Sequence, residues 1–362
     1  MASNIKTKKL DNVVYLLGAG FSAPLGIPVM SNFLEKSKDM FAVAPDQYAN
    51  FERVFTTINK MSKSKNYFNS NLFNIEEILS ILEMSEELGN EEEKSLFKNY
   101  IIDVVQYYTP KLIKRDNINP WNWKSEIFLS TDNEFNPYYS YFVGSLLNLS
   151  ISTNSKGDFF FNQLGEKRQP ARYSAITLNY DMILENCFSY YVDNYHANNT
   201  IGFSNKTEKS QEQFLQNTHL AKLHGSVDTK MIVPPTWNKG LYEDIKPAWQ
   251  LAGKLLTEAN HIRIIGYSLP VADAYIKYLL KAAIIRCDYL KSIDVLCLDR
   301  DGSVKDRYDE LICYPNYRFI NSDIKDYLLM NGPSDGDFDD NSIYMDNLET
   351  VHKAFFDHNV HS

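Results

Sequence analysis

Two glycines and a serine follow an apolar run near the start of the sequence. The run is Asn12–Leu17, and the letters GAGFSA at 18–23 come directly after it, with the spacing Gly-x-Gly-x-x-Ala. Glycines in such a turn let the backbone approach a phosphate closely, and N–H groups at the start of the next helix meet its negative charge. The spacing indicates a dinucleotide pyrophosphate site, although a plain glycine turn between a strand and a helix gives the same letters.

Polar residues also stand where three later apolar runs end. They are Asn179 and Asp181 after 173–178, His224 within 220–225, and Gly266 and Ser268 at the end of 261–266. An amide both donates and accepts hydrogen bonds, an imidazole exchanges a proton near neutral pH, and a carboxylate favours a nearby positive charge. Strand ends of a parallel sheet meet at one edge, where ligands bind, so these groups are expected to converge on one crevice.

The elements that position these residues are short β-branched runs alternating with helical patterns. Strands are predicted at 12–17, 173–178, 220–225, 261–266, 293–299 and 317–320. Helices are predicted at 182–192, 248–260 and 272–287, the last with Tyr275, Tyr278, Leu279 and Ala282 on one face. This alternation predicts an α/β fold with a doubly wound, mostly parallel sheet.

The middle of the chain has a different pattern. From about Ser31 to Arg172 strand signals are scarce, and amphipathic helices are predicted at 74–89, 95–113 and 136–150. We therefore expect a Rossmann-like core from residues 1–30 and 170–330, and a mostly helical insertion at 31–169. Residues 204–218 are expected to form a polar surface loop. Residues 331–362 are expected to form an acidic tail, loosely held before a short helix around Leu348–Phe356.

Composition excludes several classes of function. The chain has 37 Lys and Arg against 46 Asp and Glu, a net charge of −9, so direct nucleic-acid binding is not expected. Its four cysteines form no Cys-x-x-Cys pair and its seven histidines show no ligand spacing, so no metal site is expected. No apolar run is long enough to span a bilayer, and the polar start lacks a signal peptide, so we expect no membrane partner and a cytoplasmic protein.

Taken in order, the motifs resemble those of the sirtuin superfamily, whose members bind NAD and break its nicotinamide–ribose bond. The matching pieces are Gly-Ala-Gly-x-Ser with Gly-Ile-Pro at 26–28, Thr-x-Asn-x-Asp at 177–181, His-Gly at 224–225 and Gly-x-Ser at 266–268. Sirtuin deacetylases also carry two Cys-x-x-Cys pairs, and Asp-Phe-Arg follows their Gly-Ile-Pro; here Val29 and Met30 follow it. The helical insertion, NYD and IGYSLP instead resemble the sirtuin-like NAD hydrolases of bacterial antiphage defence.

The resemblance implies a role for each candidate residue. Asn179 would hold the ribose and aim a water molecule, His224 would act as general base, and Asp181 would bond the nicotinamide amide and favour the developing cation. The residues expected to line bound NAD are Gly18, Ala19, Gly20, Ser22, Pro28, Gly266, Ser268 and Asp299, the last at the adenosine ribose. Plainer interpretations stay open, namely a structural His224, a helix-capping Asp181, a turn at Asp299 and a first-turn helix residue at Asp273.

The leading hypothesis is an NAD hydrolase that yields nicotinamide and ADP-ribose and depletes NAD in antiphage defence. One alternative is NAD-dependent deacylation or ADP-ribosylation, which the missing zinc module disfavours. Another is a sensor or scaffold that binds NAD or ADP-ribose without turnover. The resemblance also implies a homo-oligomer and a partner such as a HerA-type ATPase or an Argonaute-like protein.

Overall fold

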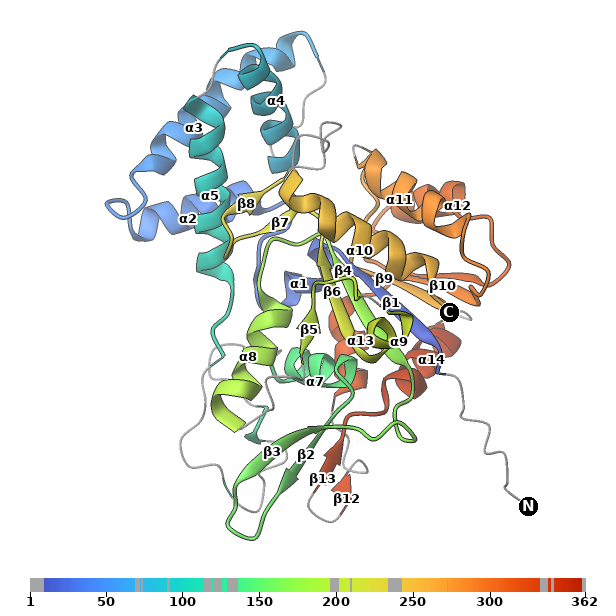
Figure 1. Ribbon diagram of the computed structural model, residues 1–362. Coiled ribbons are helices and arrows are strands. Elements are labelled where there is room, and N and C mark those ends of the chain that lie inside the picture. Colours follow the sequence, from blue (N-terminus) through green and yellow to red (C-terminus); the bar gives the residue numbers. More distant parts are fainter. Residues whose placement is uncertain are drawn as a thin grey trace, which may run out of the picture.

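A parallel sheet made from the predicted apolar runs forms the centre of the molecule (Figure 1). The computed structural model describes residues 10–68, 72, 74–89, 92–112, 119, 126–128, 136–195, 202–208, 210–233, 243–271, 273–332, 338–339 and 342–359. The sheet order is β11-β10-β9-β1-β4-β6-β5, and every neighbouring pair is parallel. The strands are β1 (Asn12–Leu17), β4 (Arg172–Thr177), β5 (Phe203–Ser204), β6 (Thr218–Lys222), β9 (His261–Ile265), β10 (Ser292–Leu296) and β11 (Tyr317–Ile320). The predicted fold class is confirmed.

The order of the strands creates the place where a ligand can bind. From β1 the chain proceeds to β4 and β6 on one side, and then to β9, β10 and β11 on the other. The connections therefore leave β1 in opposite directions, and a crevice opens at the carboxyl ends of β1, β4 and β9.

Both faces of the sheet are covered because its strands are apolar on both sides. In β1, Val13, Tyr15 and Leu17 join one buried cluster, whereas Val14 and Leu16 join another, as the alternation of side chains in a strand requires. The first cluster includes α7 (Asn136–Leu146), α8 (Ile183–Tyr195), α13 (Ile324–Asn331) and α14 (Leu348–Asn359). The second includes α9 (Gln211–Gln216), α10 (Lys246–Thr257), α11 (Ala274–Ile284) and α12 (Ser303–Leu311).

A helical unit lies over the carboxyl edge of the sheet and has a core of its own (Figure 1). It contains α2 (Phe33–Val43), α3 (Asn50–Met61), η2 (Ser62–Asn66), α4 (Ile75–Glu87) and α5 (Glu92–Tyr108). The Asn74 side chain caps α4 by accepting hydrogen bonds from the N–H groups of Glu76 and Glu77. Tyr180, which follows β4, belongs to the same buried cluster, so this unit is packed against the strand ends.

Part of the region predicted as helical forms a second sheet. Strands β2 (Leu149–Thr153) and β3 (Phe159–Gln163) make an antiparallel hairpin, and β13 (Ser342–Tyr344) and β12 (Phe338–Asp339) extend it. The expectation of a loosely held C-terminal segment is wrong for 342–347, because Ile343 and Met345 are fully buried, whereas the short helix expected around Leu348–Phe356 is present as α14. Residues 333–337 and 340–341 of that segment, and 1–9 at the start of the predicted core, lie outside the described residues.

Two further local predictions are wrong. The expected polar loop at 204–218 contains the end of β5 and the helix α9, which the Ser210 side chain caps. The predicted face of α11 is also wrong, because Tyr278 is 67% exposed and the buried residues are Ile276, Leu280 and Ala283. The α11 sequence is apolar almost all round, so its periodicity did not identify the inner face.

The remaining elements are short and lie near the crevice or before α10. They are α1 (Ala19–Ser22), η1 (Ala23–Leu25), the ribbon of β7 (Gly225–Ser226) and β8 (Met231–Ile232), and η4 (Glu243–Ile245). In the part of the chain that the structure describes, no helix is long and apolar enough to cross a membrane.

Candidate active site

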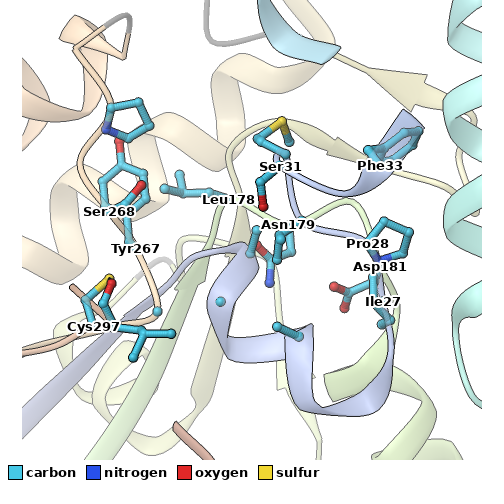
Figure 2. A pocket seen from close by; sticks show the side chains of 18 of the residues that line it. Ile27, Pro28, Ser31, Phe33, Leu178, Asn179, Asp181, Tyr267, Ser268 and Cys297 are labelled. Carbon is cyan, nitrogen blue, oxygen red and sulfur yellow. The ribbon is translucent and has the colours of Figure 1, made fainter. Parts of the chain in front are cut away.

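A cavity of about 780 Å³ lies between the carboxyl ends of the central strands and the helical unit. This volume is in the range of small-molecule sites, roughly 300–1,000 Å³. Eight of the eleven candidate residues line it: Ala19, Gly20, Pro28, Asn179, Asp181, His224, Gly266 and Ser268. Figure 2 shows several of these side chains pointing into one space from different segments. The structure thus brings together most of the residues that the sequence singled out.

The glycine turn packs closely against the end of β9. The Gly18 N–H donates to the Ile265 carbonyl at 3.0 Å, and the Gly20 N–H donates to the Gly266 carbonyl at 2.9 Å. A Cβ on Gly18 would lie 2.6 Å from Tyr267 Cα, which no real side chain tolerates. The turn therefore needs glycine for strand packing as well as for any approach to a phosphate, and two of its N–H groups are already used within the protein.

Asn179 is held by the two candidate residues that lie behind the cavity wall. Its Nδ2 donates to the Gly18 carbonyl at 3.0 Å and to Ser22 Oγ at 3.1 Å, and its side chain is buried. Because both amide hydrogens are engaged, Oδ1 is the atom that can accept a hydrogen bond from a ligand. Gly18 and Ser22 were expected to line the ligand, and here they orient Asn179.

Asp181 both caps a helix and faces the cavity. Its Oδ1 accepts a hydrogen bond from the Ile183 N–H at 3.2 Å, at the start of α8, so a capping role is present. Its carbonyl accepts from Lys222 Nζ at 2.5 Å, and Lys222 also pairs with Glu185 at 3.0 Å. The side chain is 8% exposed and lines the cavity near Pro28 (Figure 2).

His224 lies between β6 and β7 and is 2% exposed. The next residue, Gly225, has φ of +84°, and a Cβ there would lie 2.1 Å from the Met231 carbonyl oxygen, so only glycine fits. His224 Nε2 lies 3.9 Å from Oδ2 of Asp273, which is also 2% exposed and lines the cavity. The sequence analysis considered Asp273 only as a first-turn helix residue. Its position shortly after the polar strand end IGYSLP was the one sequence feature that could have pointed to a place in the cavity wall.

Ser268 and Pro28 line the cavity on opposite sides of the glycine turn (Figure 2). Asp299 does not line it. The Asp299 side chain is buried, and its Oδ2 accepts a hydrogen bond from the Lys305 N–H at 2.9 Å in the first turn of α12. Its neighbour Arg300 lines the cavity instead, so the ribose-binding role expected of Asp299 has no support from its position.

The cavity wall formed by the helical unit is mostly apolar and also carries the charged Glu76. It contains Phe33, Ile75, Ile101 and Val105, and Cys297 lies on the wall near Ser268 (Figure 2). Burial raises the pKa of the Cys297 thiol to about 12, so it is protonated at neutral pH. Among the described residues, no group of three His, Cys, Asp or Glu side chains is placed to hold a metal ion.

Comparison with protein families finds a match for part of this chain. Residues 174–311 match the family model of the SIR2-like domain. The match supports a domain of the sirtuin superfamily here. It covers less than half of the chain but includes Asn179, Asp181, His224 and Asp273. No curated protein matches the sequence.

Solved structures of Sir2 proteins align over most of the chain with low identity. One is a complex with the inhibitor EX-527, 2′-O-acetyl-ADP-ribose and deacetylated p53 peptide, at 12% identity, 88% of this chain, 90% of that chain and a TM-score of 0.33. Sir2 bound to acetylated peptide is 11% identical, the alignment covers 89% of this chain and 92% of that chain, and the TM-score is 0.34. Sir2 with p53 peptide and NAD⁺ is 13% identical, the alignment covers 89% of this chain and 92% of that chain, and the TM-score is 0.31.

Proposed function

We propose that this protein hydrolyses NAD at the bond between nicotinamide and ribose. The reaction consumes NAD⁺ and water and releases nicotinamide, ADP-ribose and a proton. The observation that carries the proposal is the orientation of Asn179, which lines the cavity together with Asp181 and His224. Its two amide hydrogens are donated to the Gly18 carbonyl and to Ser22 Oγ, so Oδ1 is left to accept a hydrogen bond from a ligand. The SIR2-like match and the sequence resemblance to sirtuins support NAD as the substrate.

The shape of the cavity suits a dinucleotide that crosses the strand-order switch. Ala19, Gly20 and Ser268 lie where the pyrophosphate would be, at the ends of β1 and β9. Arg300 and Lys325 line the side near β10 and would favour the negative charge of the phosphates. The nicotinamide end would lie near Asn179 and Asp181, under the segment that contains Pro28.

The three polar side chains match the needs of the bond that breaks. Nicotinamide leaves as a neutral molecule from a cationic ring, so no general acid is required. Asn179 Oδ1 would accept a hydrogen bond from a ribose hydroxyl or the attacking water, and Asp181 would stabilise the oxocarbenium-like charge. Oδ2 of Asp181 makes no hydrogen bond to a described residue, so this oxygen is available for that role. His224 would take the proton from the water.

The cellular role that we propose is depletion of NAD during antiphage defence in the cytoplasm. It rests on the resemblance of the helical insertion, the NYD sequence and the IGYSLP sequence to that group of proteins. The same resemblance supports a homo-oligomer, and a HerA-type ATPase or Argonaute-like protein as partner. Comparing NAD levels and survival of phage-infected cells that express the wild-type chain or the His224→Ala variant tests this role. Equal NAD levels in both would contradict it.

The biochemical proposal is tested with the purified full chain and NAD, followed by chromatography of the products. We expect nicotinamide and ADP-ribose from the wild type, and a loss of at least about 100-fold in Asn179→Ala and His224→Ala. His358→Ala, at the exposed end of α14, is the matched control and should retain full activity. Saturable NAD binding without turnover would indicate a sensor, and nicotinamide release that requires an acetylated peptide would indicate a deacylase.

A further inference from the structure

A second carboxylate faces the candidate base from a different part of the chain. Asp273 precedes α11 and His224 follows β6, and each side chain is only 2% exposed. His224 Nε2 and Asp273 Oδ2 are 3.9 Å apart in the wall of the same cavity. An anion and an imidazole this close inside a protein interact strongly, because little water separates them.

Tyr267 also holds the Asp273 carboxylate in place. Tyr267 Oη donates a hydrogen bond to the same Oδ2 at 2.8 Å. Burial, together with the Asp273 charge, raises the pKa of Tyr267 well above its ordinary value, so the phenol remains a donor. The Asp273 N–H also donates to the Pro270 carbonyl at 3.1 Å. The carboxylate is thus set in place before any ligand enters.

The loop that carries both residues is held by α12. Tyr308 Oη donates to the Tyr267 carbonyl at 2.7 Å, and the Arg307 guanidinium donates twice to the Ser268 carbonyl at 3.0 and 3.1 Å. Leu269 has φ of +51°, a conformation unfavourable for leucine that persists only where the surroundings enforce it. Such a loop, part of which is visible in Figure 2, is rigid support for a functional side chain.

Asp273 is not explained by helix capping alone. The side chains of Asn74, Ser210 and Asp323 cap their helices by accepting N–H hydrogen bonds. Asp273 stands at the same position of α11, yet no side-chain capping bond forms there among the described residues. Its carboxylate is directed to Tyr267 and towards His224 instead.

We propose that Asp273 is the positioning residue of His224, a role that rests on the proposed function. It holds the His224 ring in place and balances the positive charge that His224 gains when it takes the proton of water. Asp273 keeps its charge throughout and takes no proton. The 3.9 Å separation is longer than a hydrogen bond, and contacts of this kind shorten when substrate binds.

The first test measures His224 itself and does not depend on NAD turnover. The pH titration of the histidine ring signals is followed by NMR in the full chain, with His224 assigned by its loss in His224→Ala. All the variants compared keep the other titratable groups on the cavity wall, which are Glu76, Tyr180, Asp181, Tyr267, Cys297, Arg300, Asp323 and Lys325. In Asp273→Asn we expect the His224 midpoint to fall by about one pH unit or more.

The matched control is Asp288→Asn, which removes the same charge from an exposed position beyond the other end of α11. It should leave the His224 midpoint unchanged. An unchanged midpoint in Asp273→Asn overturns the proposal, even if that variant is less stable to heat, because a merely structural residue would lower stability without moving the titration.

The second test measures the dependence of kcat/KM for NAD on pH. In Asp273→Asn we expect the acidic limb to move to lower pH and kcat to fall about 10- to 100-fold. An acidic limb that stays in place overturns the proposal. If wild-type protein binds NAD without turnover while the NMR midpoint still moves, the hydrolase function fails and the pairing of Asp273 with His224 stands.

Discussion

Replacing Ser22 with alanine tests whether the glycine turn acts on the chemistry through Asn179. The Ser22 hydroxyl is 1% exposed and accepts one of the two hydrogen bonds from Asn179 Nδ2. In Ser22→Ala the second hydrogen of that amide has no acceptor, and a buried donor without a partner costs about 1–3 kcal/mol. The amide can then turn, and Oδ1 is no longer held in one orientation.

The expected effect follows from that free energy. If this free energy is lost from the stabilisation of the transition state by Asn179, kcat/KM for NAD drops by about 5- to 150-fold, since about 1.4 kcal/mol corresponds to a factor of ten. The assay is release of nicotinamide at varied NAD concentration, combined with thermal unfolding of each variant. NAD binding should change less than kcat, because Ser22 does not line the cavity.

Ser37→Ala is the matched control for this experiment. Ser37 is equally buried, and its hydroxyl accepts a hydrogen bond from Tyr100 Oη at 2.7 Å inside the helical unit. Its loss should lower the free energy of unfolding by a similar amount, about 1–3 kcal/mol, and leave kcat unchanged. Wild-type kcat/KM in Ser22→Ala, or an equal loss of activity in both variants, would refute the reasoning.

Two further predictions concern His352, which affects stability, and Asp299, the candidate that does not line the cavity. Burial, reinforced by Arg263, lowers the pKa of folded His352 from 6.5 to about 4. Unfolding therefore takes up a proton, and the free energy of unfolding should fall by up to about 3 kcal/mol as pH drops from 6.5 to 4. In denaturant unfolding, the free energy of unfolding of His352→Gln should depend less on pH over this range. The same pH dependence in wild type and variant would contradict the assignment. In Asp299→Ala the free energy of unfolding should fall by about 1 kcal/mol, because a hydrogen bond at the start of α12 is removed, while KM for NAD stays within about twofold of the wild-type value. A tenfold or larger rise in KM would restore Asp299 to the ligand site.

The main sheet was predictable because its strands are apolar on both faces. Runs such as Asn12–Leu17 can be buried only where helices cover both sides of a sheet, so composition and spacing were sufficient. The hairpin at 149–163 was missed because it follows α7 with little change in composition. Its partner β13 lies in a segment whose composition predicts an acidic tail. The pairing of β13 with β2 joins residues far apart in the sequence, so no local pattern indicates it.

The positions of some candidate residues could likewise be predicted from the sequence, and those of others could not. Asn179, Asp181 and His224 follow strands that were themselves predictable, so their common position at one edge followed from parallel topology. The Asp299 side chain turns away from the cavity because a hydrogen bond to the α12 backbone is available to it. No pattern in the sequence distinguishes a strand-end acid that binds a ligand from one that begins a helix.

The sequence by itself determined the parallel sheet, the sheet edge at which the cavity lies, and most of the polar side chains that meet there. Those follow from local rules, since strand periodicity and polar strand ends are properties of neighbouring residues. Only the tertiary structure decided which atoms those side chains present. Ser22 orients Asn179 across the space between β1 and β4, and Asp273 faces His224 across the crevice from the loop after β9. Such contacts join distant segments, and they exist only once packing has fixed the distances between them.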